Sequence, residues 1–525
     1  MGKGIARYGF ARASRPPLAG AAPARIFTSL VAIVMAAAIA IPATAAARPN
    51  VVLIVTDDQT AQSFNQVTMP RTVRLLANRG TSFSDAVVAT PQCCPSRATM
   101  LTGQYDINHG VIANEPGYSL LRQKANTLPA WLSRAGYTTA HVGKYLNHYE
   151  DFAGTEPAPG WDRWFSLLAA DYRNPSYSVD GKRRKSGKGE YVTRRLSSVA
   201  ARMIEGFSAQ ERPFFLQLNQ LAPHIGGASY PGRCNGAPTP DPRDEDLFLD
   251  EPIPQTPAFN EADVSDKPHF MQAQAQLSAR QVEKLQTYYG CSLATLRAVD
   301  RGTGRVVAAL RKEGQLDNTL IIFTSDNGFS FGDHRVPDTK GLPYEEHLRV
   351  PLVIRAPGDV GARTRGESLE SVVANVDLAP TILDFAAAKP CLAKETCRRM
   401  DGRSLRTLLR GQTPRWESDR AIRISFNINA ARYGLSCAWE GLRTSSTMLV
   451  EHVSAPGEYS EGNTCVPASI WERYDLTADP FQLDNLGLPA DDPQAAGLAA
   501  RLESLRFCSG IKGDVKPLAG RPFCE

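Results

Sequence analysis

The chain reads Asn50-Val-Val-Leu-Ile-Val-Thr-Asp-Asp-Gln59 where its first strand is expected. The run is apolar, rich in β-branched residues and short, which is typical of a strand buried on both faces. Asn318 to Ser325 has the same character and also ends in polar residues, Asp326-Asn327. Two further strands are predicted over Pro213–Leu218 and Arg349–Arg355. Two helices are predicted over Val192–Phe207 and Ala279–Lys312. Strands that alternate with helices predict a largely parallel α/β sheet.

The two strand ends carry Asp57, Asp58, Asp326 and Asn327. Ligands of such sheets bind at the carboxyl ends of the strands. Three carboxylates and an amide form a hard, all-oxygen set that suits Ca²⁺ or Mg²⁺. Each pair alone could be a turn or a helix cap. Two pairs after two buried strands favour a divalent cation.

A second informative segment reads Pro91-Gln-Cys-Cys-Pro-Ser-Arg-Ala-Thr-Met-Leu-Thr-Gly103. Pro95 suits the first turn of a helix, which we expect to run toward Gly103 and to begin at Cys93. Free N–H groups at that end, together with the Arg97 guanidinium, favour an oxyanion. The alternative interpretation is that Cys93 and Cys94 are simply buried or disulfide-bonded.

Cys93-x-Pro95-Ser96-Arg97 resembles the formylglycine motif of the type I sulfatase family, in which the cysteine is oxidised to an aldehyde. The order Asp-Asp, Cys-x-Pro-Ser-Arg, Lys, His, Asp-Asn, Lys of that family is reproduced here. Gly143-Lys-Tyr-Leu-Asn147 is similar to glucosamine-6-sulfatases and extracellular heparan sulfate sulfatases. The resemblance extends from about Pro49 to Leu486. It implies an alkaline-phosphatase-like α/β fold, with a central mixed, mostly parallel sheet flanked by helices.

The resemblance also implies roles for single residues. Its metal ligands would be Asp57, Asp58, Asp326, Asn327 and an oxygen of modified Cys93, with Ca²⁺ as the favoured ion and Mg²⁺ as the alternative. The hydrate of the aldehyde would be the nucleophile, and Arg97 would steady it. The groups that contact sulfate would be Lys144, His224 and Lys340. Leu146 stands where arylsulfatases carry a histidine, and His148 is the candidate replacement, with an ordinary loop residue as the alternative. His334 receives no role.

The function implied is hydrolysis of sulfate monoesters, either carbohydrate esters of the glucosamine-6-sulfate type or aryl sulfates. The alternative is a phosphonate or phosphate ester hydrolase of the same superfamily. An inactive relative that binds sulfated glycans is a third class, disfavoured because Cys93, Arg97 and the metal ligands are all present. The implied partners are a sulfated small molecule or glycan and a formylglycine-generating enzyme.

Three parts of the chain are expected: a signal peptide over 1–47, a catalytic domain over 48–410 and a C-terminal antiparallel α+β subdomain over 411–525. Arginines precede an apolar run from Ile26 to Ile41, which is shorter than the roughly 20 residues that span a bilayer. A membrane anchor is the alternative. We therefore expect a secreted or periplasmic protein that does not span a membrane when mature. Short extended stretches at 421–426 and 447–453, then a helix at 493–505, indicate the subdomain.

Charge and cysteine content limit which partner, compartment and metal the protein can have. The 59 basic and 54 acidic residues leave a net charge of only +5, which argues against nucleic acid as a partner. Ten cysteines fit an oxidising compartment, and no ligand spacing for zinc is present. Plausible disulfides, whose connectivity the sequence leaves open, are Cys391–Cys397, Cys437–Cys465, Cys508–Cys524 and Cys234–Cys291.

Two other segments stand out by composition. Tyr177 to Lys185 contains an Asp-Gly turn and is expected to form a hairpin outside the main sheet. Its basic run, Lys182–Lys185 with nearby Lys188, is interpreted as a solvated tip, with attraction of a sulfated polyanion as the alternative. The segment from Cys234 to Pro268 is rich in Pro and acidic residues and is expected to be a long surface excursion.

Overall fold

A computed structural model describes residues 48–525 apart from 229, 428–437 and 454–469. A sheet of ten strands forms its centre, in the order β11-β2-β10-β9-β1-β8-β4-β5-β6-β7. The central strands β9, β1, β8, β4 and β5 are mutually parallel, whereas β10, β6 and β7 join in antiparallel fashion. Their bounds are β1 Asn50–Asp57, β2 Thr81–Phe83, β4 Thr138–Gly143, β5 Arg163–Leu167, β6 Ser176–Val179, β7 Lys182–Lys185, β8 Phe214–Pro223, β9 Thr319–Ser325, β10 Leu352–Arg355 and β11 Ser368–Leu369. The predicted mixed, mostly parallel sheet is confirmed.

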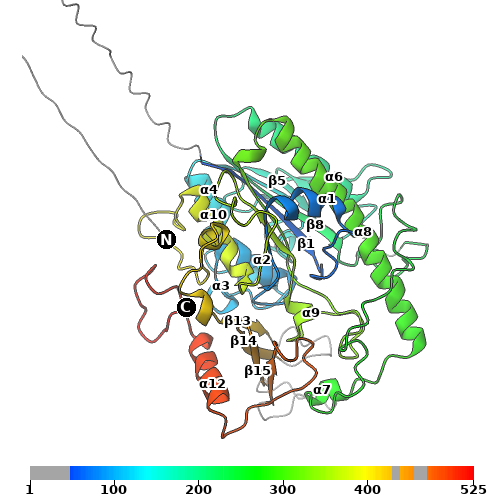
Figure 1. The fold of residues 1–525 in the computed structure, drawn as a ribbon. Coiled ribbons are helices and arrows are strands. Elements are labelled where there is room, and N and C mark those ends of the chain that lie inside the picture. The colour runs from blue at the N-terminus through cyan, green and yellow to red at the C-terminus, as the bar shows by residue number, and fades with distance from the viewer. Residues whose placement is uncertain (1–47, 229, 428–437, 454–469) are drawn as a thin grey trace, which may run out of the picture. The chain divides into compact units, whose positions relative to one another are not determined.

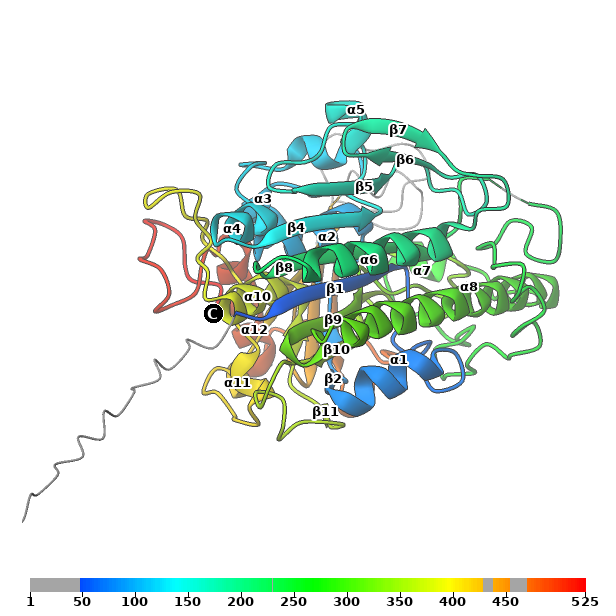
Figure 2. The same cartoon turned by 90° about the horizontal axis from the view of Figure 1, so that it is seen from above.

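Helices cover both faces of this sheet (Figure 1; Figure 2). Alternate side chains of β1 point to opposite faces, as the period of a strand requires. Val52 and Ile54 pack with α6 (Val192–Ser208) and α8 (Ala279–Lys312), while Leu53 packs with α2 (Cys93–Thr102). Both faces of the strand are therefore dry, which explains its unbroken apolar sequence.

The shorter elements connect and flank these layers. They are α1 Pro70–Leu75, η1 Ala77–Arg79, β3 Ala86–Val87, α3 Asp106–His109, η2 Gly117–Leu120, α4 Leu128–Arg134, α5 Tyr149–Ala153, α7 His269–Gln272, η3 Leu316–Asn318, α9 Glu345–Leu348, β12 Val373–Ala374, η4 Asn375–Asp377, α10 Leu378–Ala386, α11 Arg406–Leu409 and η5 Glu417–Asp419.

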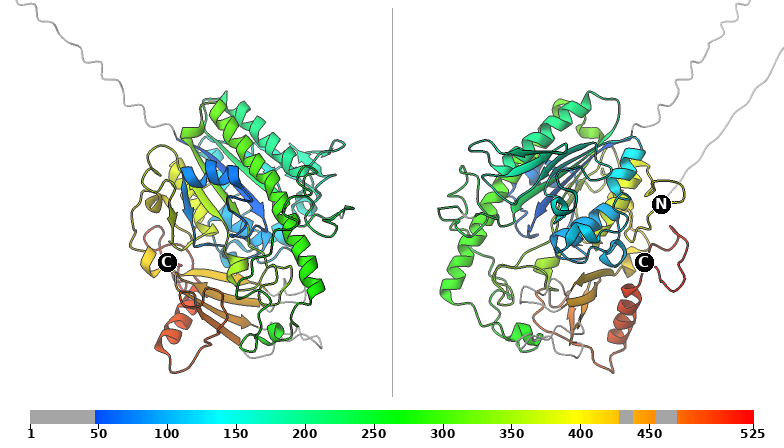
Figure 3. Two further views of the ribbon diagram at one scale, coloured as in Figure 1. Left: turned by 45° about the vertical axis from the view of Figure 1, so that its right-hand side comes forward. Right: turned by 180° about the vertical axis from the view of Figure 1, so that it is seen from behind.

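A second, antiparallel sheet follows in the order β13-β14-β15-β16. Its strands are β13 Ile422–Phe426, β14 Ala438–Arg443, β15 Thr447–Val453 and β16 Ile470–Asp475, and α12 (Pro493–Arg506) packs against it. Figure 3 shows this sheet beside the helix and apart from the large sheet. The predicted small antiparallel unit is thus confirmed, whereas its boundary at residue 410 stays a prediction.

Three sequence-based details are corrected or confirmed. The hairpin of β6 and β7 was expected outside the main sheet, but β6 pairs with β5 and extends that sheet to its edge. The expected strand over 349–355 is shorter, since β10 begins at Leu352. Disulfides join Cys234–Cys291, Cys391–Cys397 and Cys508–Cys524, as predicted. Cys437 and Cys465 lie outside the described residues, as does the predicted signal peptide.

Candidate active site

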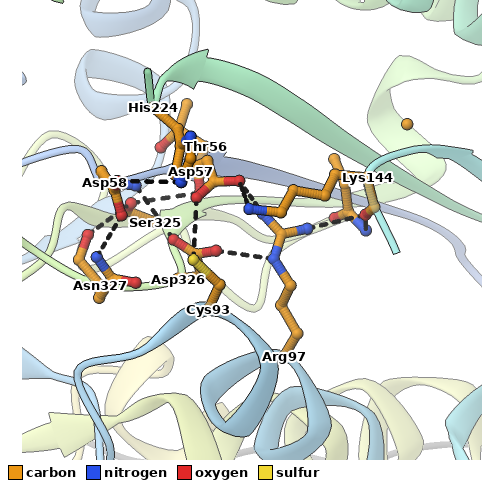
Figure 4. A network of polar contacts seen from close by, with 12 residues as sticks. Thr56, Asp57, Asp58, Cys93, Arg97, Lys144, His224, Ser325, Asp326 and Asn327 are labelled. Carbon is orange, nitrogen blue, oxygen red and sulfur yellow. Dashed lines mark hydrogen bonds and ion pairs between the residues drawn. The ribbon is translucent and has the colours of Figure 1, made fainter. Parts of the chain in front are cut away.

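The carboxyl ends of β1 and β9 lie side by side because the two strands pair in parallel, with Thr56 opposite Ser325. The residues that follow, Asp57 and Asp58 on one strand and Asp326 on the other, therefore meet at one point (Figure 4). The Asp58 backbone N–H donates to Asp326 Oδ1 over 3.2 Å. The parallel register of β1 and β9 therefore brings these residues together in space, although they are far apart in the chain.

Helix α2 begins at Cys93, as predicted, and ends before Gly103, which adopts the left-handed conformation. Cys93 is buried and its Sγ lies 3.3 Å from Asp57 Oδ1 (Figure 4). Neither Cys93 nor Cys94 forms a disulfide. The alternative of a disulfide at this position is therefore excluded, and the helix N-terminus directs Cys93 into the acidic cluster.

The cluster has the composition of a cation site. One ligand atom each from Asp57, Asp58, Cys93 and Asp326 lie within 4.8 Å of one another. Asn327 Nδ2 donates to Asp58 Oδ1 over 2.7 Å, while its buried Oδ1 has no hydrogen-bond partner among the described residues. A buried amide oxygen without a partner is costly. Carboxylate and amide oxygens gathered in this way fit a divalent cation such as Ca²⁺.

Arg97 extends from the first turns of α2 to two of these carboxylates. Its Nε donates to Asp326 Oδ2 over 2.7 Å, and its Nη2 lies 3.3 Å from Asp57 Oδ2. Nη1 donates to the backbone oxygen of Lys144 over 2.9 Å. The side chain is buried, so its fixed charge acts at close range with little solvent screening.

Two lysines enter the same cluster from different loops. Lys144 follows β4 and its Nζ lies 2.5 Å from Asp57 Oδ2. Lys340 Nζ contacts Asp58 Oδ1 and donates to Cys93 Sγ over 3.0 Å. Three cations, counting Arg97, therefore surround three carboxylates around the Cys93 side chain. The two lysine side chains stay partly accessible, at 15% and 16% of their surface.

His224 lies immediately after β8, and its Nε2 is 3.8 Å from Asp58 Oδ2. Its Nδ1 is 2.5 Å from the backbone oxygen of Ile225, which only accepts, so Nδ1 carries a proton. Nε2 is thereby the ring atom presented to the cluster (Figure 4). Tyr172 donates its hydroxyl to the backbone oxygen of His224 over 2.7 Å and helps to hold the loop.

The crowded charges perturb the acid strengths of the site. Burial and the charge of Asp57 raise the pKa of the Cys93 thiol to about 12, so the thiol is protonated near neutral pH. Burial, again with Asp57, raises the pKa of Asp326 to about 6. Burial acts to raise the pKa of Asp57 as well, but the charges of Lys144 and other nearby cations outweigh it and lower that pKa. An unmodified Cys93 here is a poor nucleophile.

Two further histidines considered in the sequence analysis, His148 and His334, pair with residues outside the cluster. His148 is partly exposed, with Nδ1 2.7 Å from Asp151 Oδ2 and Nε2 3.8 Å from Glu115 Oε1. In the part of the chain that the structure describes, no hydrogen bond or ion pair joins His148 to the cluster, and its role stays a prediction. His334, which received no role, is buried with Nδ1 2.6 Å from Glu261 Oε2.

Three asparagines that the sequence analysis did not identify form hydrogen bonds with residues in or next to the cluster. Asn114 Oδ1 accepts from the Cys94 backbone N–H over 2.8 Å and so caps α2. Asn375 Nδ2 donates to Ser96 Oγ over 2.8 Å, and Asn219 Nδ2 donates to the Lys144 backbone oxygen over 2.8 Å. Asn219 lies on the continuation of a buried strand that the sequence predicts. The other two come from loops whose position no local pattern indicates.

Comparisons with known proteins show the family of the chain. The model of the family described as sulfatase matches residues 49–388, well over half of the chain. The chain belongs to the sulfatase family. The model described as N-sulphoglucosamine sulphohydrolase, C-terminal, matches residues 332–506 of this sulfatase. The family and the enzyme class expected from the sequence are thereby confirmed.

Individual relatives span most of this sulfatase. Human N-acetylglucosamine-6-sulfatase is 32% identical and the alignment covers 88% of this chain and 85% of the relative. A solved protein in complex with its substrate D-glucosamine-2-N,6-O-disulfate is 26% identical, with a TM-score of 0.64 and coverage of 87% and 97%. A phosphonate monoester hydrolase of Agrobacterium radiobacter, 24% identical with a TM-score of 0.63 and coverage of 87% and 95%, is similar in fold.

The described residues of this sulfatase contain no helix that is both long enough and apolar enough to cross a bilayer.

Proposed function

We propose that this sulfatase hydrolyses 6-O-sulfate esters of glucosamine-type sugars at Cys93. The observation that carries the proposal is the convergence of three carboxylates, Asn327 and three cations on a buried cysteine at a helix N-terminus. The sugar is suggested by the human relative and by the glucosamine disulfate complex described above. Substrate identity and the roles of single residues are part of this proposal.

The nucleophile is proposed to form by oxidation of Cys93 to formylglycine, carried out by a formylglycine-generating enzyme during maturation. The raised pKa of the thiol supports this, since a protonated thiol would not attack an ester at neutral pH. The aldehyde hydrate supplies two hydroxyl groups, one to attack sulfur and one whose collapse releases sulfate without attack by water. Arg97 holds the surrounding carboxylates in place while this occurs.

The remaining residues bind and orient the ester. Lys144 and Lys340 carry their Nζ atoms to the cluster from different loops, and each can donate to a sulfate oxygen. His224 presents Nε2 toward the same point, where the leaving alcohol oxygen would lie. Asp57, Asp58, Asp326 and Asn327 would hold Ca²⁺, or Mg²⁺, which when bound polarises the sulfate oxygens. His148 is the proposed candidate for assisting aldehyde regeneration, although among the described residues it forms no hydrogen bond or ion pair with the cluster.

The choice between sulfatase and phosphonate hydrolase is tested with matched esters. Sulfate, phosphate and phosphonate monoesters of one alcohol, together with N-acetylglucosamine 6-sulfate, are offered to protein with confirmed aldehyde at position 93. We expect kcat/KM for the sulfate ester to exceed the other two by at least about 10-fold, a difference of roughly 1.4 kcal/mol in transition-state binding. Faster cleavage of the phosphonate would move the enzyme to the alternative class.

Removal of the metal is a separate prediction. Because Asn327 Oδ1 has no partner among the described residues and three carboxylates are close together, a bound cation should stabilise the fold. We expect a chelator to lower kcat by about 100-fold and Tm by at least about 3 °C, since a ligand at 100 times its Kd contributes roughly 2.7 kcal/mol. Re-addition of Ca²⁺ should restore both, and Mg²⁺ less completely. Unchanged activity and Tm after exhaustive chelation would contradict the metal site.

Export is also proposed, on the basis of the disulfides and the basic-apolar N-terminal sequence.

A further inference from the structure

The edge strand β7 consists of four consecutive cations, Lys182, Arg183, Arg184 and Lys185, and all four side chains are exposed. It is the last strand of the large sheet, beyond β5 and β6 (Figure 2). We propose that this strand, called here the basic edge, binds the sulfated polysaccharide chain of which one sugar occupies the active site. The proposal rests on the proposed function and extends it from a sugar to a polymer.

The charges of the basic edge are available to a ligand. None of the four side chains has a hydrogen bond or an ion pair with a described residue. Two acidic residues close to the hairpin in sequence, Asp180 and Glu190, are engaged elsewhere. Asp180 Oδ2 lies 3.2 Å from Arg163 Nη2, and Glu190 accepts from the Tyr177 hydroxyl over 3.0 Å. The Glu156 carboxylate lies beside Gly181 in the turn of the hairpin. Among the described residues it forms no ion pair with the four cations, so their side chains stay available to a ligand.

Strand register places the basic edge level with the active site. Gly143, the residue before Lys144, pairs with Ser166 of β5. Ser166 pairs with Ser178 of β6, and Ser178 pairs with Arg183. Arg183 therefore lies in the same row of the sheet as the start of the Lys144 loop, three strand spacings away. At about 4.8 Å for each spacing, the lateral distance is about 14 Å.

This distance decides what kind of ligand can use both places. Cys93 itself lies farther away, because it contacts Asp57 at the end of β1, and β1 is five strand spacings from β7, or about 24 Å at about 4.8 Å each. A single sugar bound beside Cys93 does not extend that far. A chain of several sugars does, and each further sulfate that it carries can accept from a lysine or from the forked donors of an arginine. A polymer is therefore expected to gain affinity from the basic edge, and a monosaccharide is not.

Two alternative roles for these charges are protection of the edge strand from pairing and binding of single-stranded nucleic acid. Charged side chains on an edge strand prevent pairing with another sheet, which would require no ligand. Single-stranded nucleic acid uses exposed aromatic side chains for base stacking, but the one aromatic residue of the hairpin, Tyr177, is only 2% exposed. The observed surface therefore favours a sulfated glycan over a nucleic acid.

The test combines Lys182→Gln, Arg183→Gln, Arg184→Gln and Lys185→Gln in one protein. A matched control removes four exposed arginines of α1, η1 and α8, toward the opposite end of the sheet, by Arg71→Gln, Arg74→Gln, Arg79→Gln and Arg311→Gln. Sulfate release is measured from N-acetylglucosamine 6-sulfate and from a defined heparin oligosaccharide. We expect the basic-edge variant to lose at least about 10-fold in kcat/KM on the oligosaccharide and less than about 2-fold on the monosaccharide. The control should lose little on either.

Binding of the heparin oligosaccharide, measured over a series of salt concentrations, separates this proposal from the proposed function. If neither substrate is hydrolysed by the unaltered enzyme, the proposed substrate is wrong, but weaker binding and a shallower salt dependence in the basic-edge variant alone would still support the basic edge. Equal binding and equal turnover by both variants would overturn it. Tighter binding of a single-stranded DNA oligonucleotide than of the oligosaccharide, lost in the same variant, would overturn it in favour of nucleic acid.

Discussion

Replacing Cys93 with alanine should abolish sulfate release, with a loss in kcat of at least about 10⁴-fold, or roughly 5.5 kcal/mol of barrier. The reason is that the helix N-terminus, Lys340 and Asp57 converge on a single side-chain atom at position 93. Alanine leaves the binding groups in place but removes the attacking atom. The measurement is single-turnover and steady-state sulfate release, with Tm as a check on folding.

Serine at the same position gives a sharper outcome. Cys93→Ser keeps one hydroxyl able to attack sulfur but lacks the second hydroxyl of an aldehyde hydrate. We expect the alcohol to be released once and the sulfate to stay on the introduced side chain, detectable by intact-protein mass as one added sulfate group. Sustained turnover by Cys93→Ser would contradict the proposed nucleophile.

Cys94 provides the matched control for both variants. It is the adjacent residue, equally buried and also free, but its backbone N–H is held by Asn114 and its side chain faces away from the carboxylates, toward the backbone oxygen of Asn147. Cys94→Ala should therefore keep its activity within a few-fold. If it lost as much as Cys93→Ala, local misfolding of α2 would account for both results, and the role assigned to Cys93 would fail.

Arg97 is expected to give the second-largest effect, on stability as well as on activity. Removal of one partner from a buried ion pair leaves uncompensated charge and costs about 3–5 kcal/mol. In Arg97→Ala, Asp326 and Asp57 would both lose this partner. Burial already raises the pKa of Asp326, and loss of the guanidinium removes a charge that opposes this rise. We expect kcat to fall by about 10²–10³-fold and the free energy of unfolding to fall measurably.

Arg97→Lys separates charge from geometry. A lysine restores one positive charge but cannot donate at once to Asp326, Asp57 and the Lys144 backbone oxygen, as Arg97 does through Nε, Nη2 and Nη1. We expect most of the stability to return while kcat stays at least about 10-fold low. Full recovery of kcat would show that only the charge matters, and an Arg97→Ala variant of undiminished stability would contradict the expected cost of breaking the buried pair. Urea unfolding at matched Ca²⁺ supplies the stability values.

Local sequence was sufficient for the elements that are longest and most regular. The apolar run of β1, the periodic pattern of α8 and the proline near the start of α2 each have a physical effect that acts within a few residues. α8 spans the predicted residues Ala279–Lys312, and α2 begins at Cys93 as expected. The turn of the β6–β7 hairpin is readable from the sequence, but its place in the sheet is not, because the Asp-Gly signal fixes only the turn and leaves open which strand pairs with β6.

For the candidate site too, sequence predicts the residues, and tertiary structure determines their positions. The residue types and their order along the chain predict a site made of Asp57, Asp58, Cys93, Arg97, Lys144, His224, Asp326, Asn327 and Lys340, and the structure places these residues close together, while their roles stay predictions. His148 is predicted by the same reasoning, but among the described residues no hydrogen bond or ion pair joins it to this set. Its position depends on its own left-handed conformation at the start of α5 and on Asp151, which no motif encodes.

The sequence by itself determined which groups are available and which elements carry them, because propensity, burial pattern and motif spacing are local properties of the chain. Only the tertiary structure decided which groups meet. Parallel register brings Asp57 beside Asp326. Two loops, one shortly after α2 and one distant in the chain, supply Asn114 and Asn375 to hold α2. Three strand pairings set Arg183 level with the Lys144 loop. These contacts join separate strands and loops, some of them hundreds of residues apart in the chain, and their energies exist only after the chain has folded.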